Sequence, residues 1–364
     1  MILKEIIDCL ERLAPPSLQE SYDNSGLITG SADMDISAAL ICLDSTPEVI
    51  EEAISKNCNL VIAHHPIIFS GLKKLNGKNY IERAVMLAIK HDIAIYAIHT
   101  NLDNVQHGVN MMVAEKLGLK NTSILEPRSG LLDKLVVFVP NSHAELVRQA
   151  IFEAGGGHLG NYDQCSFNMT GIGSFRAGNG ANPYSGTIGT QHTTEETRIE
   201  VILPKWITGK VVKAMKAAHP YEEVAHDIYP LSNLLTNAGS GLLGELEAPL
   251  NTITFLQHVK DTLKSGCLKY TATHKQKVQH IAVCGGSGSF LLQQAIAAGA
   301  DVLVTADFKY HQFFDADQRI IIADPGHYES EQFTIQLLSN WLKAEMPTFA
   351  TRFTELNTNP VNYL

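Results

Sequence analysis

The sequence predicts an α/β protein in which two α/β halves with mixed sheets form one core, interrupted by a smaller inserted α+β domain. Short apolar runs alternate with amphipathic segments over residues 1–128 and again over 236–364, which is typical of helices on both faces of a largely parallel or mixed sheet. Residues 129–235 follow a different order of elements. With 364 residues, 45% of them hydrophobic, the chain is long enough for two or three units.

The elements of the first half follow from its periodicity. Charged residues spaced among apolar ones over residues 3–13 predict an amphipathic helix and not a signal peptide. Apolar runs then predict strands, and longer periodic segments predict helices. We expect strands at 38–43, 60–63 and 93–98, and helices at 47–57, 81–90 and 109–117.

The second half resumes the same alternation. We expect strands at 281–284, 302–305 and 320–323, and helices at 253–263, 290–298 and 332–343.

The pattern of residues 129–235 predicts two strand-helix-strand units. It predicts strands at 134–139, 198–203 and 224–229 and helices at 144–154 and 206–218, with an exposed hairpin or loop over 171–194, which is rich in Gly, Asn and Thr. This order predicts a ferredoxin-like sandwich. Domain insertion is tolerated at exposed loops whose ends lie close together, so the second half is expected to complete the fold begun by the first.

Composition narrows the class of partners and the compartment. The net charge of -10 and the lack of a run of Lys and Arg argue against nucleic acid as a partner, unless oligomerisation creates a basic channel. The six cysteines include no Cys-x-x-Cys pair, so a zinc ribbon or a disulfide framework is not expected. Without an uninterrupted apolar span of about 18 residues, no membrane helix is expected. We therefore expect a cytoplasmic protein.

The pair His64-His65 is the most informative motif. It follows the apolar run Leu60-Val61-Ile62 and is stopped by Pro66. Neighbouring side chains on a strand point to opposite faces, so both imidazoles can serve one site only if the backbone turns there, and Pro66 supplies that break. The carboxyl end of a strand is where open α/β sheets place ligands, and two imidazoles suit a transition metal.

Two further segments supply partners for this pair. Polar residues from His99 to Asp103 follow the predicted strand at 93–98. A helix begun around Pro325 would place His327 and Glu331 four residues apart and therefore on one face. These residues complete a set of three imidazoles and two carboxylates, namely His64, His65, Asp103, His327 and Glu331.

Five mixed ligands exceed the usual needs of one ion. Three or four protein ligands satisfy a single metal, whereas five favour two ions that share a carboxylate. We therefore predict two divalent metal ions per subunit. Ligand types allow zinc, manganese, iron, cobalt or nickel, because selectivity among them depends on geometry and supply.

Several separated motifs carry a family resemblance. Six segments are involved: Ala63-His64-His65-Pro66, His99-Thr100-Asn101-Leu102-Asp103, Gly326-His327-x-x-x-Glu331, Asp23-Asn24-Ser25-Gly26-Leu27, Gly285-Gly286-Ser287-Gly288 and the segment from Thr305 to His311. In these motifs the chain resembles the NGG-one-interacting-factor-three-like family. The bacterial members of that family are called GTP cyclohydrolase 1 type 2 homologues. Similar proteins often have Gly where Ala306 stands.

The family resemblance implies site residues, an inserted domain and an oligomeric state. It spans residues 1–125 and 240–364 and places the family's metal ligands on the same five residues, with His311 as a candidate catalytic acid or base. The middle segment, including His219-Pro220-Tyr221, resembles the PII-like or CutA-like insertion of longer members. The resemblance also implies a homo-oligomer, a ring-shaped hexamer.

Two classes of function follow. A water bridging two divalent metals loses a proton near neutral pH and becomes a nucleophile, which favours hydrolysis. The resemblance adds a small-molecule nucleotide, GTP, whose purine ring would be opened while His311 moves protons. Another amidohydrolase or phosphoester hydrolysis is the alternative within enzymes. The competing class is a non-catalytic metal-binding regulatory or trafficking protein whose PII-like insert senses a ligand or mediates assembly.

Four secondary candidates have two interpretations each. His99 is a metal ligand or a hydrogen-bonded neighbour of the ligands. Gly285 to Gly288 cradle a phosphate or form a tight turn required by packing. Asp44 lines the cleft or caps the helix that begins at Pro47. His219 and Glu222 bind a regulator or a metal, or lie in a solvated loop.

Overall fold

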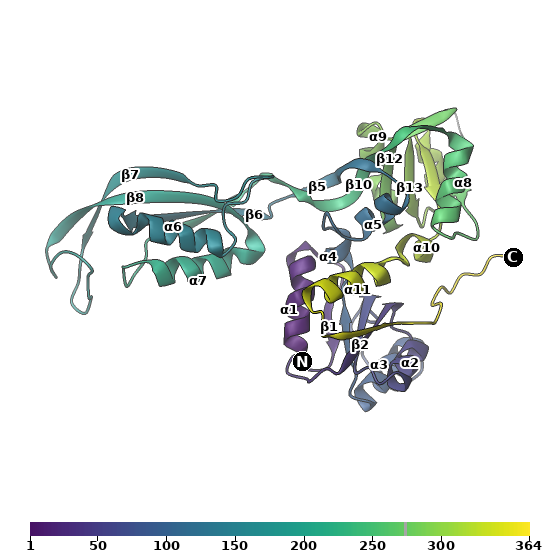
Figure 1. Cartoon of the computed structure of the whole chain (residues 1–364), viewed down its shortest axis with the longest axis horizontal. Coiled ribbons are helices and arrows are strands. Elements are labelled where there is room, and N and C mark those ends of the chain that lie inside the picture. Colours follow the sequence, from purple (N-terminus) through teal and green to yellow (C-terminus); the bar gives the residue numbers. More distant parts are fainter. Residues whose placement is uncertain (273–274) are drawn as a thin grey trace. The chain divides into compact units, whose positions relative to one another are not determined.

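The computed structural model describes residues 1–272 and 275–364, and the chain divides into two compact units (Figure 1). Unit 1 combines Met1–Pro127 with Thr236–Leu364, and unit 2 is Arg128–Leu235. Both crossings between the units fall within long strands, β5 (Lys120–Ser129) and β10 (Leu234–Asn251). Unit 2 is thus an insertion into the sequence of unit 1.

The first sheet of unit 1 has five strands. Their order is β1 (Gly26–Thr29), β4 (Ala94–Ala97), β3 (Leu60–His65), β2 (Ala38–Asp44) and β15 (Ala350–Phe353). Strands β4, β3, β2 and β15 are parallel, and β1 pairs with β4 in the antiparallel direction. The near-continuous burial of β2, β3 and β4 is typical of parallel strands covered on both faces.

Helices cover both faces of this sheet. Residues of α2 (Pro47–Ser55) and α3 (Tyr80–Lys90) pack on one face in a core with alternate residues of β2 and β3. On the other side lie α1 (Leu3–Leu13) and α11 (Thr334–Glu345), and α11 packs against β2 (Figure 1). The first and last helices of the chain therefore share one face of the N-terminal sheet.

The second sheet of unit 1 has six strands. Their order is β11 (Lys269–Tyr270), β14 (Ile321–Asp324), β13 (Val302–Ala306), β12 (Lys277–Ser287), β10 and β5. The three central strands β14, β13 and β12 are parallel, whereas β11 and β10 pair in the antiparallel direction. The remaining helices of unit 1 are α4 (Thr100–Asp103), α5 (Val109–Lys116), α8 (Thr252–Thr262), α9 (Leu292–Ala297) and α10 (His327–Glu331).

Both sheets are mixed, and the predicted α/β class is confirmed. The sequence patterns missed β1, β5, β10, β11 and β15, because these strands lie at or near sheet edges and lack a continuous apolar run. The predicted helix near Pro325 is α10, which begins at His327, and the predicted helix at 332–343 is α11. No helix among the described residues has both the length and the apolar composition needed to cross a bilayer.

Unit 2 has one four-stranded sheet. The chain runs through β6 (Leu132–Pro140), α6 (Ala144–Glu153), β7 (Phe167–Arg176), β8 (Gln191–Pro204), α7 (Thr208–Ala218) and β9 (His226–Leu231). The strand order β7-β8-β6-β9 is antiparallel throughout, which is the ferredoxin-like arrangement that the sequence predicts. Alternate residues of β6 and β8 pack against α6 and α7 to form a separate core. The Gly-rich stretch is the distal part of the β7–β8 hairpin.

Candidate metal centre

The two histidines of the Ala-His-His-Pro motif end β3, where Pro66 stops the strand. The Nδ1 of His64 lies 2.8 Å from the carbonyl oxygen of Ile98, and the Nδ1 of His65 lies 2.8 Å from Oδ1 of Asp44. Each ring is therefore held through Nδ1, which leaves Nε2 to face the site. The imidazole centroids lie 4.9 Å apart, so both side chains belong to one cluster.

Helix α10 contributes the third imidazole and a buried carboxylate. His327 and Glu331 lie on one face, with Nε2 of His327 3.0 Å from Oε2 of Glu331. The Nδ1 of His327 lies 2.7 Å from Oδ2 of Asp307, which follows β13 and has a left-handed φ of 63°. A non-glycine residue in that region of backbone space is uncommon and gathers at functional sites.

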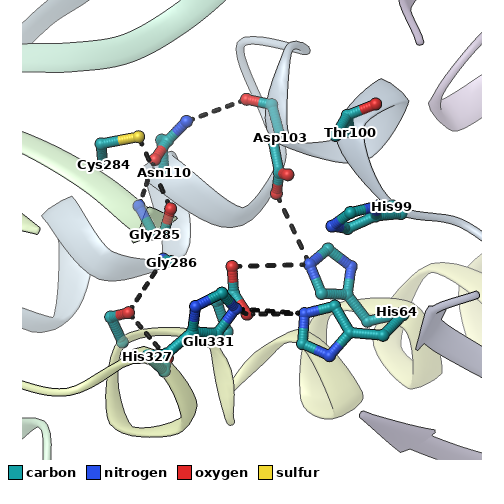
Figure 2. Close-up of polar contacts among 12 residues, drawn as sticks. His64, His99, Thr100, Asp103, Asn110, Cys284, Gly285, Gly286, His327 and Glu331 are labelled. Atoms are coloured by element: carbon teal, nitrogen blue, oxygen red, sulfur yellow. Dashed lines mark hydrogen bonds and ion pairs between the residues drawn. The ribbon is translucent and has the colours of Figure 1, made fainter. Parts of the chain in front are cut away.

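Asp103 ends α4, directly after β4. Its Oδ1 lies 3.6 Å from Nε2 of His64. The Asn110 side chain donates to the carbonyl oxygen of Asp103 at 2.8 Å and accepts from the Gly285 N–H at 2.8 Å (Figure 2). Asn110 therefore fastens the segment that carries Asp103 to the end of β12.

Glu331 lies between two sets of donors (Figure 2). Its Oε2 is 3.0 Å from Nε2 of both His65 and His327, and its Oε1 is 3.8 Å from Nε2 of His64. Among the described residues, two groups with metal-ligand geometry share this carboxylate, and a third consists of imidazoles alone. The groups are His65, His327 and Glu331; His64, Asp103 and Glu331; and His64, His65 and His99.

Two polar atoms test whether this cluster fits a cation. The Nε2 of His64 and the Oδ1 of Asp103 are buried without a hydrogen-bond partner in the described chain, although they face each other. A buried unpaired polar atom costs about 1–3 kcal/mol, and such groups persist where they bind something. Imidazole nitrogen and carboxylate oxygen are donors that transition metals accept, so the residues fit divalent cations.

Two glycines near the end of β12 make room for Glu331. A Cβ on Gly286 would lie 2.1 Å from Oε1 of Glu331, and one on Gly285 would lie 3.4 Å from its Cγ. The N–H groups of Gly285 and Gly286 donate to Asn110 and to Ser330 Oγ, so these two amides are not directed at a ligand. For this pair the structure supports packing and corrects the phosphate-cradle interpretation.

Two carboxylates outside the ligand set orient the imidazoles. Asp44 accepts from His65, and Asp307 accepts from His327, which fixes the ring orientation and makes each Nε2 a better ligand. The interpretation of Asp44 as a helix cap is wrong, because Thr46 caps α2 by accepting from the Val49 N–H. The only sequence signal for the role of Asp44 beside the cluster was its position at the end of a predicted strand.

The charges of these groups compensate one another. Burial alone would lower the pKa of His65 and His327, but Glu331 and the orienting carboxylates outweigh it and raise these pKa values to about 10 and about 11. Burial and the negative charge of Glu331 raise the pKa of Asp103, whereas the two imidazoliums hold the pKa of Glu331 well below its usual range despite burial. Cation binding would therefore release protons from the imidazoles.

His99 stands beside the ligands. Its ring centroid lies 5.2 Å from those of His64 and His65, and its Nδ1 lies 2.8 Å from Oδ1 of Asp23. Asp23 also accepts from the Thr100 N–H and hydroxyl and from Ser25. The Asp23 motif therefore positions His99, a role that the sequence did not reveal.

His311 lies apart from the cluster. It is exposed on the 3-10 helix Tyr310–Ala316, with its ring against those of Tyr310 and Phe314, and is not among the described residues that line the cavity. In unit 2, both ring nitrogens of buried His219 are hydrogen-bonded, to the Phe138 carbonyl oxygen and the Tyr221 N–H, so the solvated-loop interpretation of His219 is wrong.

A cavity of about 1060 Å³ in unit 1 contains the cluster. It is lined by residues from the exits of β2, β3, β4, β12 and β13 and by the C-terminal segment after β15. Thr358 of that segment donates to Oδ2 of Asp44 at 2.6 Å. The strand exits of both sheets thus line one cavity.

The comparisons with known proteins agree with this architecture. The family model Duf34/NIF3 (NGG1p interacting factor 3) matches residues 1–360. A protein of Halalkalibacterium halodurans is 41% identical over 324 residues, covering 88% of this chain and 87% of its own length. A protein of Bacillus subtilis is 38% identical over 369 residues, covering 99% and 98%. Both bear the name GTP cyclohydrolase 1 type 2 homolog.

Solved structures match over the whole chain. A Bacillus cereus protein related to NIF3 superposes with a TM-score of 0.89 at 39% identity, covering 100% of this chain and 99% of its own. A Staphylococcus aureus protein superposes with a TM-score of 0.78 at 30% identity, with the same coverage. The two-sheet unit and its insertion therefore occur together in similar proteins.

Proposed function

This chain belongs to the Duf34/NIF3 family, and on that premise we propose that it is a dinuclear metal-dependent hydrolase of a small molecule. One observation carries the proposal. The two oxygens of Glu331 are divided between separate donor sets, Oε2 toward His65 and His327 and Oε1 toward His64. A carboxylate shared in this way is the usual bridge of a two-metal hydrolytic site.

Each donor set would hold one cation. His65 and His327 would bind the first, His64 and Asp103 the second, with Glu331 common to both. When bound, the cations would lower the pKa of a water and polarise the bond under attack. Asp44 and Asp307 keep two of the imidazoles oriented toward the cations.

Proton transfer requires a further group facing the cavity. His99 lines the cavity, and because its Nδ1 is hydrogen-bonded to Asp23, its Nε2 is the nitrogen available to accept or donate a proton. We therefore assign this role to His99 within one chain. His311, the candidate from the family motif, stays a prediction that would require another copy of the chain or a rearrangement to bring it to a cavity.

GTP is the first substrate to test, because the relatives are named as homologues of a GTP cyclohydrolase. Other amide and phosphoester substrates are alternatives within the same hydrolytic chemistry.

A non-catalytic metal-binding protein with a ligand-sensing insert is the second candidate. It is favoured by a cavity of about 610 Å³ in unit 2, lined by Phe138, Tyr184, Tyr221, Glu196 and Arg198 among others. Aromatic rings with a few charged groups are typical of small-molecule sites. The alternative also allows the insert to mediate assembly, and the ring-shaped hexamer stays a prediction, which mass photometry of the purified protein would test.

Anomalous diffraction at several metal edges would count the cations and identify them. We expect two peaks, one between His65 and His327 and one between His64 and Asp103. Metal-loaded protein would then be incubated with nucleotides, amides and phosphoesters. We expect turnover in the native protein, loss in Glu331→Gln, and none of this loss in Glu247→Gln, an exposed glutamate of β10. Two bound cations without turnover on any substrate would favour the non-catalytic alternative.

A further inference from the structure

We propose that the unit 1 cavity selects an uncharged or cationic substrate with a planar ring and excludes nucleoside triphosphates. This inference rests on the proposed function, because it concerns the substrate of the same site. The relatives' names suggest GTP as a substrate, whereas this inference excludes triphosphates and keeps planar rings that carry no negative charge. Two features of the cavity support the proposal, namely the negative charge of its lining and the exposed aromatic side chains within it.

The cavity lining is strongly acidic. Eight carboxylate side chains line it. Four are the ligand and orienting carboxylates of the metal centre, and the others are Glu20, Glu48, Asp324 and Glu329. Among the described lining residues, Lys269 is the only Lys or Arg, and its Nζ lies 2.6 Å from Oδ2 of the buried Asp324. The one ammonium group is therefore already paired.

Bound cations do not reverse this balance. Two divalent ions would contribute four positive charges, so that with neutral imidazoles the lining would still carry about three negative charges in excess. A triphosphate would bring several more negative charges into a partly desolvated cavity, where repulsion is stronger than in water. Apart from metal ions, sites that recognise phosphate present Arg forks or free backbone N–H groups. Here no arginine is among the described lining residues, and the Gly285 and Gly286 amides are committed to Asn110 and Ser330.

Exposed aromatic side chains line the same cavity. Tyr22, Phe69, Tyr80 and Phe290 are 69%, 54%, 52% and 56% exposed, although large rings gain most from burial. The Phe69 ring lies 5.8 Å from that of His99, which places it beside the metal centre. Exposed rings next to a reactive centre offer stacking faces, and stacking accepts any planar ring without reading its charge.

Equilibrium binding measurements distinguish the contribution of the planar ring from that of the triphosphate charge. Guanosine and GTP share the base and ribose, as do adenosine and ATP, so isothermal titration of metal-loaded protein with each pair isolates the triphosphate. We expect each nucleoside to bind at least about tenfold more tightly than its triphosphate. Raising the salt concentration should narrow the gap, because it screens the repulsion. Tighter binding of the triphosphates, or no binding of either nucleoside, would overturn the proposal.

Two pairs of matched variants test the negative charge of the lining and the exposed aromatic rings separately. Removing one charge by Glu48→Gln should strengthen GTP binding about threefold more than guanosine binding, whereas Glu51→Gln, on the same helix but outside the lining, should change neither. Phe69→Ala should weaken nucleoside binding severalfold. Phe314→Ala, also exposed but outside the lining, is its control. Equal effects within either pair would contradict the assignment of that cause.

The proposal on the substrate class and the hydrolase proposal can each be contradicted without the other. Nucleoside binding without hydrolysis would leave the substrate class standing and contradict the hydrolase proposal. Turnover of GTP with triphosphate binding tighter than nucleoside binding would do the reverse.

Discussion

Gly286 and Glu331 occupy adjoining space in unit 1: a Cβ on Gly286 would lie 2.1 Å from Oε1 of Glu331. The glycine has a φ of +60°, and its carbonyl oxygen accepts from the buried Thr305 hydroxyl at 2.9 Å. The end of β12 is therefore fixed in place, and the carboxylate can reach both donor sets because no side chain stands between.

Gly286→Ala should displace Glu331 and abolish binding of both cations, measured by elemental analysis after gel filtration. Gly299→Ala is the control, since Gly299 also has a positive φ, +76°, but a Cβ there would meet nothing within 4 Å. Both variants carry left-handed strain of about 1 kcal/mol, so the contacts of the new Cβ with Glu331 and His327 distinguish them. Full cation content in Gly286→Ala would show that Glu331 can move without loss.

Asp103→Ala and His327→Ala should each leave one cation of two, because each removes a ligand that belongs to one donor set. Glu331→Gln should reduce the content below one, since Glu331 belongs to both sets. Elemental analysis gives the number, and anomalous peaks show which site remains. Simultaneous loss of both cations in Asp103→Ala would mean that the sets do not fill independently.

Asp44→Asn should weaken cation binding about 10- to 100-fold, because the neutral amide holds the His65 ring less firmly and lowers its basicity. Competition with a fluorescent chelator measures the change. Thr358→Val removes only the hydrogen bond of the C-terminal segment to Asp44, and its effect should be smaller. An equal loss in Thr358→Val would assign the effect to the C-terminal segment.

Asp23→Asn should lower the free energy of unfolding at pH 7 by about 2 kcal/mol or more. Burial alone would raise the pKa of Asp23, but hydrogen bonds from His99, Thr100 and Ser25 hold it well below the usual range. A lowered folded-state pKa stabilises above the unfolded value of about 4, and this stability is lost as the pH falls further.

Urea unfolding of both proteins, with chelator present, checks this pH dependence. The difference between native protein and Asp23→Asn should be largest at neutral pH and should shrink below about pH 4. A difference that stays constant with pH would mean that the shape of the side chain matters and its charge does not.

Local patterns predicted the parallel strands other than β15 and most of the helices, because these elements follow from runs of apolar residues and from helical spacing. They also named the clustered residues His64, His65, Asp103, His327 and Glu331, because polar side chains at strand exits and at helical i, i+4 spacing leave a signal in neighbouring residues. The roles of Asp307 and Asp23 left no such signal, since their partners His327 and His99 lie 20 and 76 residues away.

The sequence by itself determined the α/β class and the donor chemistry of the clustered side chains, since each depends on residues close together along the chain. Only the tertiary structure decided that β15 joins the first sheet beside β2, that Glu331 lies between His64 and His327, and that Asp44 orients His65 and does not cap a helix. Those relationships depend on how the two sheets of unit 1 bring their strand exits together, and packing over several hundred residues sets that arrangement.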